Sequence, residues 1–296
     1  DDMLTTTILA SHAPKLIAPA MNTGMYENPV TQNNLALLKK YGMEVIEPAA
    51  GHLACGDEGK GKMPEPEILY EHILRSCACK QDMKGLKVLV TAGPTQEAVD
   101  PVRFLTNHSS GRMGYSIAKA CMLRGADVTL VTGRTALTPP LFVDVIPVVS
   151  AKDMYDAVIS RSDEMDIIIK AAAVADYRPV HVAEEKVKKS DGSFSLELER
   201  TDDILKYLGE HKKPGQFLCG FSMETENMLE NSRKKLEKKH LDMIAANNLK
   251  VPGAGFETTT NIITIITPDS VKELELMSKD DAAFRLLDEI LSRRSR

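Results

Sequence analysis

Short apolar runs alternate with helical stretches along the chain from about residue 84 onward. The runs are GLKVLVTAG, ADVTLVTG, VDVIPVV, DIIIKAAAV, FLCGFSME and MIAANN. Continuous apolar strands that are joined by helices are typical of a parallel sheet with both faces covered. The pattern therefore predicts an α/β fold built on a Rossmann-like, doubly wound and mostly parallel sheet.

The intervening stretches predict helices over residues 112–124, 151–164, 203–211, 228–240 and 281–293. SFSLELER alternates with period two and interrupts this order, so we expect it to form a strand outside the regular winding. A helix and a polar, charged stretch precede residue 84, in PEPEILYEHILRSCACKQDMKG. We therefore expect two domains, one over residues 1–83 with a linker at its end and one over residues 84–296.

Composition narrows the classes of function. The net charge is -5 and Trp is absent, so neither a basic face nor an aromatic platform suggests nucleic-acid binding. No apolar run is long enough to span a bilayer, and no signal peptide is recognisable. The five cysteines are odd in number and irregularly spaced, which favours a reducing, cytoplasmic location. The chain opens with Asp inside an apparent helix, and we expect it to be the remainder of a longer one.

The stretch TNHSSGRMG, residues 106–114, offers many hydrogen-bonding groups and little bulk before a helix begins. A helix N-terminus has unpaired N–H groups and a partial positive charge, so it attracts phosphate where no side chain obstructs the approach. Ser109, Ser110, Gly111 and Gly114 are small residues at that place. The GxGxxG spacing is missing, and a Ser here is equally consistent with an ordinary N-cap.

TAGPTQEAVDPVRFLTNHSSGRMGYSIA resembles the signature of phosphopantothenate–cysteine ligases, the second half of the bifunctional coenzyme A biosynthesis proteins of the CoaBC family. The blocks KAAAVADYRP, EEKVKKSDG, ERTDDIL, GFSMETEN and RKKLEKKHLDMIAANN follow in that family's order. The resemblance extends from about residue 85 nearly to the end of the chain. It implies ligation of 4′-phosphopantothenate with L-cysteine through an acyl-cytidylate, with CTP as co-substrate and Mg²⁺. The choice between CTP and ATP stays open.

The resemblance also implies which residues contact the nucleotide. Three of them are lysines, on a loop and on one helix face, and for them a solvated loop and a surface basic stripe are the alternative interpretations. Asp176 follows a strand, and its carboxylate would act through magnesium or a ribose hydroxyl; a capping role is the alternative. The turn DDIL is equally a helix N-cap, and Phe221 equally a core ring. The full set is Ala172, Asp176, Lys186, Asp202, Asp203, Ile204, Leu205, Phe221, Lys235 and Lys239.

Asn107 is the expected catalytic residue of the ligase. An amide donates to a developing oxyanion without changing its protonation state, and the resemblance assigns the matching Asn to conversion of the acyl-cytidylate. Arg103 and His108 are expected to bind the substrate phosphate, together with Ser109, Ser110 and Gly111. The resemblance and the SFSLELER excursion together predict a homodimer through this domain.

The first 83 residues resemble the C-terminal half of the flavin-dependent phosphopantothenoylcysteine decarboxylases, a partial flavodoxin-like domain. PAMN contains Asn22, matched to a residue that holds the substrate carboxylate. GHLACGDEGKGKMPEPE contains Cys55 on a Gly-rich flap, matched to the proton donor. Lys62 stands where the flap usually carries Arg. The family's flavin-phosphate loop and catalytic His are missing here, so we expect FMN binding and decarboxylation to require the full-length parent, as a higher homo-oligomer.

Two other classes of protein remain as alternatives. VLVTAG and the following helix look like the opening of an NAD(P)-dependent reductase, with Arg134 placed for a 2′-phosphate. The glycine spacing and the long PTQEAVDPVRFLTNHSS insertion argue against it. A non-catalytic binding protein would require inert Lys and Asp residues, and nucleotide turnover distinguishes it from an enzyme.

Overall fold

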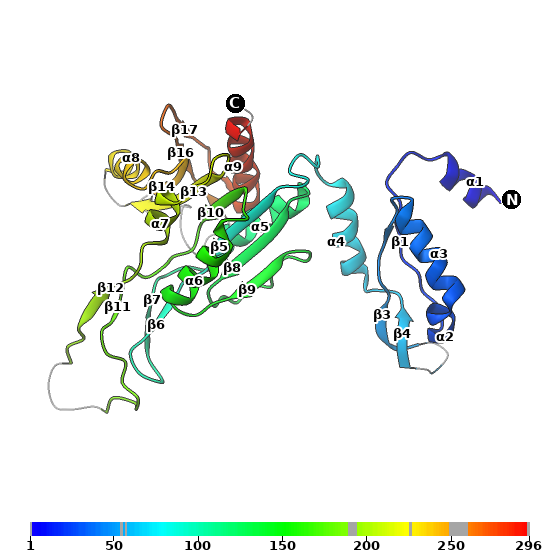
Figure 1. The fold of residues 1–296 in the computed structure, drawn as a ribbon, viewed down its shortest axis with the longest axis horizontal. Helices are drawn as coiled ribbons and strands as arrows, with labels where there is room; N and C mark the ends of the chain where they lie inside the picture. The colour runs from blue at the N-terminus through cyan, green and yellow to red at the C-terminus, as the bar shows by residue number, and fades with distance from the viewer. Residues whose placement is uncertain are drawn as a thin grey trace. The chain divides into compact units, whose positions relative to one another are not determined.

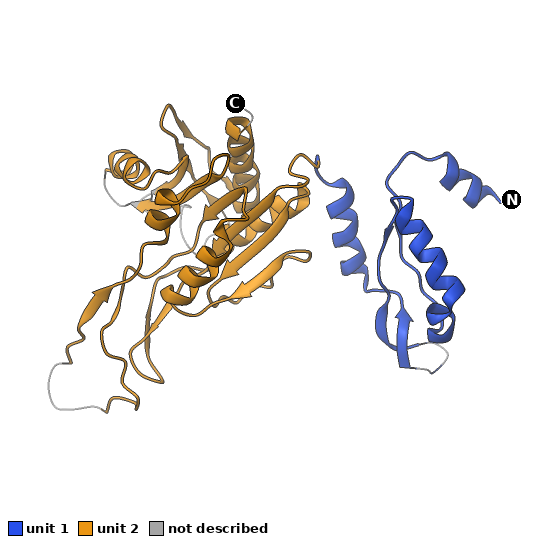
Figure 2. Ribbon diagram, in the orientation of Figure 1, with its two compact units in different colours: residues 1–80 blue, residues 81–296 orange. Residues whose placement is uncertain are grey.

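A computed structural model describes residues 2–53, 56, 58–188, 194–224, 227–248 and 260–294. The chain forms two compact units, Asp1–Lys80 (unit 1) and Gln81–Arg296 (unit 2), which are coloured separately in Figure 2. None of the described helices combines the length and the apolar character needed to cross a bilayer.

Unit 2 is built on a sheet whose described strands lie in the order β17-β16-β14-β13-β10-β5-β8-β9 (Figure 1). Their bounds, in chain order, are β5 Lys87–Ala92, β8 Asp127–Thr132, β9 Asp144–Pro147, β10 Ile167–Lys170, β13 Phe217–Glu224, β14 Met243–Asn248, β16 Thr264–Ile266 and β17 Val271–Glu273. Six neighbouring strands of this sheet, namely β14, β13, β10, β5, β8 and β9, pair in parallel. The predicted Rossmann-like, mostly parallel sheet is confirmed.

The strand order reverses between β5 and β10. From β5 the chain moves outward through β8 to β9, and it then returns to β10 on the other side of β5 and moves outward through β13 to β14. In open α/β sheets a ligand binds at this reversal, beyond the carboxyl ends of the strands. Beyond β14, β16 and β17 add an antiparallel edge that the sequence analysis did not anticipate.

Helices cover both faces of the sheet. α5 (Arg112–Leu123) packs on β5 and β8 and against α9 (Lys279–Arg294). The opposite face carries α6 (Ala151–Ser162), α7 (Ile204–Glu210) and α8 (Met228–Lys238). Their apolar residues, such as Met154, Leu208 and Leu236, form one buried cluster with Ile168 and Leu218 of the sheet. α9 begins two residues earlier than expected, where Ser278 Oγ accepts a hydrogen bond from the backbone of Asp281 at 3.0 Å.

Two antiparallel ribbons extend from the sheet in Figure 1. One pairs β6 (Gln96–Ala98) with β7 (Phe104–Thr106), and the other pairs β11 (Tyr177–Pro179) with β12 (Leu198–Arg200). β12 lies within SFSLELER, so the expected strand outside the main winding is present. A short pair, β15 (Thr260–Asn261) with β18 (Met277–Ser278), precedes α9.

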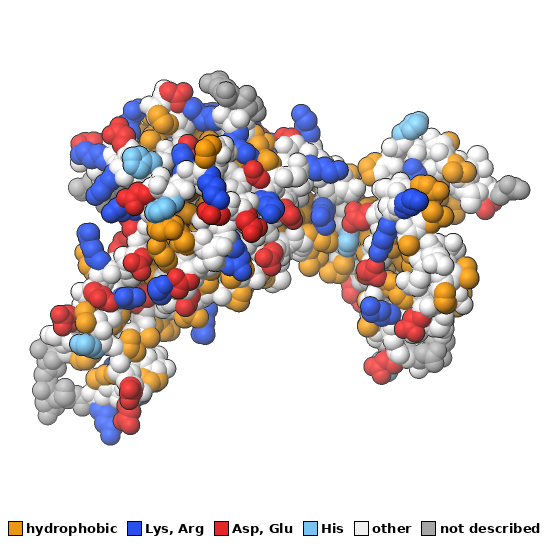
Figure 3. Space-filling model, viewed as in Figure 1, with side chains coloured by type: hydrophobic (Ala, Val, Ile, Leu, Met, Phe, Trp, Pro, Cys, Tyr) orange, Lys and Arg blue, Asp and Glu red, His pale blue; other side chains and the backbone are white. Residues whose placement is uncertain are grey.

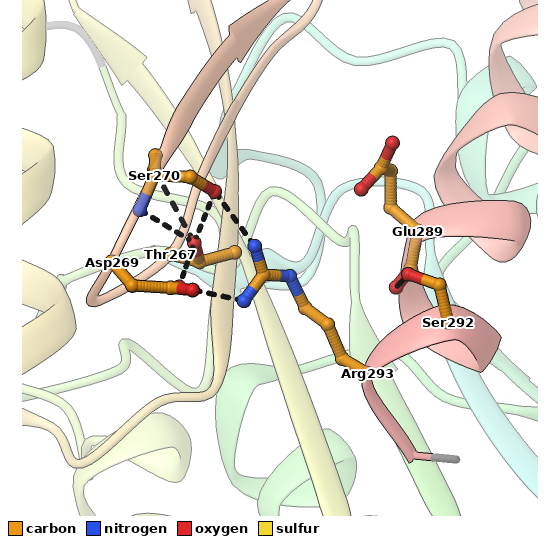
Figure 4. A network of polar contacts seen from close by, with 6 residues as sticks. All are labelled: Thr267, Asp269, Ser270, Glu289, Ser292 and Arg293. Atoms are coloured by element: carbon orange, nitrogen blue, oxygen red, sulfur yellow. Dashed lines mark hydrogen bonds and ion pairs between the residues drawn. The ribbon is translucent and has the colours of Figure 1, made fainter. Parts of the chain in front are cut away.

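The end of α9 is tied to the turn between β16 and β17 (Figure 4). Arg293 donates from Nη1 to Asp269 Oδ1 at 2.6 Å and from Nη2 to Ser270 Oγ at 2.7 Å. Thr267 Oγ1 donates to Asp269 Oδ1 at 2.9 Å. These bonds fix the antiparallel edge against the last helix.

Unit 1 contains α1 (Met3–Ala10), α2 (Thr23–Glu27), α3 (Pro29–Lys40) and α4 (Pro66–Cys77). β1 (Leu16–Ile17) pairs in parallel with β2 (Glu44–Val45), and β3 (Ala49–His52) forms a hairpin with β4 (Glu58–Lys62). Among the described residues its buried apolar side chains are Tyr26, Leu35 and Ile46.

Candidate functional site

A cavity of about 140 Å³ lies at the reversal of the strand order in unit 2. The segment between β7 and the first turn of α5, the residues that follow β10 and the last half of β13 meet there, joined by residues from β14, β15 and the start of α9. Its lining residues are 109–114, 171–173, 221–223, Asn247, Asn261 and Lys279. The cavity therefore brings together five of the predicted site residues, namely Ser109, Ser110, Gly111, Ala172 and Phe221.

The N-terminus of α5 is open toward this cavity. Its N-cap is Gly111, in the left-handed conformation with φ 77°, and no side chain caps the first turn. Ser109 Oγ instead accepts a hydrogen bond from the Gly111 N–H at 3.3 Å. Ser109 therefore does not form the ordinary Ser N-cap, and the start of α5 presents backbone N–H groups of the kind that bind an anion.

Gly114 brings α5 close to β5. A Cβ atom at this position would lie 2.6 Å from Ala92 Cβ and 2.9 Å from the Thr91 carbonyl oxygen. Only a glycine permits this separation between helix and strand. The positive end of α5 is thereby held at the carboxyl edge of the sheet.

The cavity also contains polar residues that the sequence analysis missed. Asn247 is buried, and its Oδ1 has no hydrogen-bond partner among the described residues. A buried acceptor without a partner is costly, and a donor on a ligand would satisfy it. Lys279 is also buried; desolvation, and after it the charge of Arg112, lowers its pKa. The first Asn of MIAANN was a visible signal, whereas nothing local marked Lys279.

The two predicted helix lysines lie on the inner side of α8. Lys235 Nζ donates to the Phe221 carbonyl oxygen at 2.9 Å, and Lys239 Nζ pairs with Asp203 Oδ2 at 2.8 Å. Both lysines are half-buried, while Lys234 and Lys238 of the same basic run are exposed. The run is therefore more than a solvated stripe, because two of its members face the end of β13.

Asp203 has a capping role as well as its ion pair. Its Oδ1 accepts the backbone N–H of Lys206 at 3.0 Å at the start of α7. Burial works against the charged carboxylate, but the hydrogen bond from Lys239 and the cap outweigh it and lower the pKa. Ile204 and Leu205 are buried in the core, so only their backbone is placed for contact with a ligand. Asp202 is exposed beside them.

Asn107 is held beside the loop that follows β10. Its Nδ2 lies 3.3 Å from the carbonyl oxygens of both Ala173 and Val174. Both neighbours are hydrogen-bond acceptors, so the NH₂ end of the amide must face them. Asp176, three residues beyond Ala173, has an exposed carboxylate without a hydrogen bond or ion pair among the described residues.

Arg103, which was expected to bind the substrate phosphate, binds other residues of the protein in this structure. Its guanidinium binds the buried Asp100 carboxylate and donates from Nη2 to the Val187 carbonyl oxygen at 2.7 Å. Asp100 also accepts the N–H of Val187 at 3.1 Å. These bonds hold the segment that presents Lys186, whose side chain is exposed. His108 is exposed next to Asn107.

Lys170 is a further charged residue that the sequence analysis passed over. It ends β10 and is half-buried beside the lysines of α8. Desolvation, and next the charge of Lys235, lowers its pKa to about 7. The sequence did contain a sign of this residue, namely a charged side chain directly after the apolar run III.

In unit 1, Asn22 caps α2 through Oδ1, which accepts the Gly24 N–H at 2.8 Å. β4 packs directly on this segment, since a Cβ on Gly61 would lie 2.1 Å from the Met21 carbonyl oxygen. Lys62 Nζ pairs with Glu65 at 2.7 Å. Cys55 lies outside the described residues.

The helix starts of unit 1 bear on flavin binding. Side chains already cap α1, α2 and α3, and α4 begins with Pro66 between Glu65 and Glu67. A flavin phosphate needs an open, positively polarised helix start or a comparable nest of N–H groups. The described helix starts of unit 1 do not fit that group.

Across the face of unit 2 in Figure 3, basic and acidic side chains are interspersed, without a broad basic area. The described residues also contain no cluster of three or more His, Cys, Asp or Glu side chains suited to a metal ion.

Comparisons with known proteins assign both halves of the chain to flavoprotein families. Residues 83–293 match the family model described as DNA/pantothenate metabolism flavoprotein C-terminal domain, and residues 1–78 match the model described as Flavoprotein. The coenzyme A biosynthesis bifunctional protein CoaBC of Bacillus subtilis is 50% identical over 98% of this chain and 72% of its own length. CoaBC of Vibrio vulnificus strain YJ016 is 44% identical over 98% of this chain and 73% of its own.

A solved structure supports the same grouping. The crystal structure of the C-terminal domain of a coenzyme A biosynthesis bifunctional protein CoaBC is 46% identical to this chain. The matched region covers 70% of this chain and 95% of the chain in that crystal structure, with a TM-score of 0.60.

Proposed function

Since the chain belongs to the family of bifunctional coenzyme A biosynthesis proteins CoaBC, we propose that unit 2 is a phosphopantothenate–cysteine ligase. It joins 4′-phosphopantothenate to L-cysteine with CTP, through an acyl-cytidylate, and gives phosphopantothenoylcysteine. The observation that carries this proposal is the cavity at the strand reversal, which is lined by the start of α5, by Phe221 and by the buried Asn247 and Lys279.

In the first half-reaction, a carboxylate oxygen of 4′-phosphopantothenate attacks the α-phosphorus of CTP. The new O–P bond forms as the bond to the leaving pyrophosphate breaks. Charge then accumulates on the phosphate oxygens, and fixed positive groups stabilise it. The N–H groups at the start of α5, together with Lys235 and Lys239, supply those groups on two sides of the site.

In the second half-reaction, the amine of cysteine attacks the acyl carbon and CMP leaves. The amine loses a proton as the C–N bond forms, and the carbonyl oxygen carries negative charge in between. We assign Asn107 to this step, and the contact of its amide with Ala173 in the loop after β10 supports the assignment. Nδ2 carries two N–H groups, so one of them would serve the substrate by leaving one of the two backbone carbonyls that it contacts in the free protein.

Mg²⁺ supplies charge neutralisation to the triphosphate when it is bound. Such sites typically use one or two protein carboxylates and the phosphates themselves, so no cage of protein ligands is required. The exposed Asp202 and Asp176 at this edge fit that requirement. The same carboxylates suit a ribose hydroxyl equally well. The base would lie against Phe221, and the buried Asn247 Oδ1 would accept from an exocyclic amine such as that of cytosine.

A homodimer through unit 2 belongs to this proposal. Large apolar side chains are exposed on and beside the two ribbons, at Phe104, Leu105, Tyr177 and Leu198. A second subunit that packs on the ribbons would remove them from water. We include a cytoplasmic location, which suits the buried free thiols of Cys121 and Cys219.

The decarboxylase half of the family's chemistry would involve unit 1. Asn22 and Cys55 are the residues matched to substrate binding and protonation. We derive no step through FMN, because the described helix starts of this unit do not fit its phosphate. Decarboxylation to 4′-phosphopantetheine is proposed only for a full-length, FMN-loaded parent, as a higher homo-oligomer.

Pyrophosphate release tests the ligase directly. The chain is incubated with 4′-phosphopantothenate, Mg²⁺ and either CTP or ATP, with and without cysteine, and the coupled product is followed by mass spectrometry. CTP-dependent release with a cysteine adduct is the expected result. Nucleotide binding without turnover would favour the non-catalytic alternative, and no release with either nucleotide would overturn the proposal. The comparisons give no support to a reductase.

A further inference from the structure

We propose that Lys170 is a third triphosphate-binding lysine of the ligase site, acting with Lys235 and Lys239. The inference rests on the proposed function, because it assumes that a nucleotide enters this site. The family resemblance assigns no role to Lys170, and its place in the structure is what draws attention to it.

Lys170 projects from the sheet face that α7 and α8 cover. It is the last residue of β10, two residues after Ile168, so both side chains lie on the same face. Ile168 belongs to the buried cluster that includes Leu205 of α7 and Leu236 of α8. The lysine therefore extends the apolar face of β10 to the carboxyl edge, where the charged residues of α8 begin.

The neighbouring strand brings the backbone of Lys170 close to the point where Lys235 is bonded. Lys170 is in register with Gly220 of β13, and Phe221 follows Gly220. Lys235 Nζ is bonded to the carbonyl oxygen of that same Phe221. One residue of β13 thus separates the backbone position of Lys170 from the point at which Lys235 is anchored.

Charged residues of both signs surround Lys170. Lys235 and Lys239 repel its ammonium, while Asp203 and Asp176 attract it. Lys239 already pairs with Asp203 at 2.8 Å, and Lys170 has no hydrogen bond or ion pair of its own among the described residues. Three lysine ammonium groups are therefore gathered around the end of β10. A polyphosphate is the kind of ligand that resolves this repulsion.

The cluster also predicts how binding couples to protons. Burial and the charge of Lys235 lower the pKa of Lys170 to about 7 in the free protein. A bound triphosphate favours the charged lysine and raises that pKa toward its ordinary value of about 10.4. At pH 8 the free site is about one-tenth protonated, so binding takes up roughly 0.9 proton at this residue. Affinity should then fall as the pH rises above 7.

The test is isothermal titration calorimetry of the full chain with CTP and Mg²⁺ at pH 8, in two buffers of different ionisation enthalpy. We compare the wild type with Lys170→Met, which keeps the length of the side chain, and with Lys170→Arg, which keeps a permanent charge. Lys238→Met is the matched control, because Lys238 is exposed on the same helix as Lys235. Circular dichroism confirms that each variant is folded.

We expect Lys170→Met to raise the dissociation constant for CTP about tenfold at pH 7, with a smaller difference at pH 9. Proton uptake at pH 8 should drop by roughly 0.9 in both Lys170 variants, while Lys170→Arg keeps most of the affinity. Lys238→Met should match the wild type. Unchanged affinity and proton uptake in Lys170→Met would overturn the inference and leave the ligase proposal intact. A wild type that binds neither CTP nor ATP would instead refute the proposed function.

Discussion

Arg103 is bonded to the backbone of Val187, with Nη2 2.7 Å from the carbonyl oxygen. The contact joins the turn before β7 to the segment that presents Lys186. Asp100 completes it by binding the guanidinium of Arg103 and accepting the N–H of Val187 at 3.1 Å. A residue expected to bind substrate thus also positions a neighbouring lysine.

Asp100→Asn should weaken the ligase through Lys186. The carboxylate accepts from Arg103 and the Val187 N–H at Oδ2 and from the backbone N–H groups of Val102 and Arg103 at Oδ1. An amide has one accepting oxygen, so one of these two sets of bonds is lost and the anchor of the segment weakens. We expect kcat/KM for the nucleotide to fall roughly tenfold, equivalent to about 1.4 kcal/mol. Steady-state kinetics measure this change. A normal kcat/KM alongside faster proteolysis near Lys186 would show that the anchor is irrelevant to catalysis.

The same carboxylate should make stability depend on acid pH. Hydrogen bonds from Arg103, assisted by the backbone N–H groups of Val102 and Val187, hold the pKa of Asp100 well below its ordinary value, against the opposing effect of burial. A lowered folded-state pKa stabilises the protein above the unfolded-state pKa of about 4, and the contribution is lost as the pH falls below it. Urea unfolding should therefore separate the wild type from Asp100→Asn most strongly at pH 7. A gap of equal size at pH 3 would contradict this.

The sequence predicted the parallel part of the sheet because its signal is local. Runs such as III before Lys170 are buried on both faces, and burial is what selects apolar, β-branched residues. At the edge formed by β16 and β17, strand β16 lies in a similar apolar run, IITIIT. Whether such a strand pairs in parallel or antiparallel depends on the connection and on its neighbour, which composition does not encode.

Residues of the site could be predicted only where their spacing in the sequence determines which way they face. Lys235 and Lys239 are four residues apart and do face inward together, as helix periodicity requires. Lys279 and Asn261 reach the cavity from elements far along the chain, so no local pattern marked them. Ile204 and Leu205 belonged to a matched block, yet their side chains fill the core. A motif match identifies a segment and leaves open which of its atoms face the ligand.

Arg124 should be a large contributor to the stability of unit 2. Its side chain is 8% exposed and binds both oxygens of Asp82, at 2.8 and 2.7 Å, as well as Asp288 at 2.7 Å. Arg124→Met leaves those carboxylates without their partner, and we expect a loss of about 3 kcal/mol of unfolding free energy. Lys152→Met, which breaks the exposed pair with Asp156, is the control and should cost less than about 1 kcal/mol. Equal losses in the two variants would refute the assignment.

The ribbon surface should control self-association. Replacing Phe104 and Leu198 by Ser removes two of the exposed apolar side chains proposed to pack on a second subunit. We expect the dimer dissociation constant to rise at least tenfold, as measured by sedimentation equilibrium. Val271→Ser changes a similarly exposed residue on the β17 edge and should have no effect. A wild type that is monomeric and fully active would eliminate the dimer from the proposal.

Asn107→Asp should separate the two half-reactions. The variant keeps the shape of the side chain, but a carboxylate cannot donate to the carbonyls of Ala173 and Val174 or to the oxyanion formed by cysteine attack. Formation of the acyl-cytidylate depends on the phosphate-binding groups at α5 and α8, so pyrophosphate release should persist. Coupling to cysteine should slow by about 10²- to 10³-fold, the usual cost of removing one oxyanion donor.

Rapid quenching and mass spectrometry distinguish the outcomes of that experiment. An accumulated acyl-cytidylate with little cysteine adduct is the expected result for Asn107→Asp. Asn107→Ala serves as the matched control, because it removes the donor without adding a negative charge that would repel the phosphates. If both variants lose pyrophosphate release as well, Asn107 positions the loop after β10 for the first step, and its role in the second is lost.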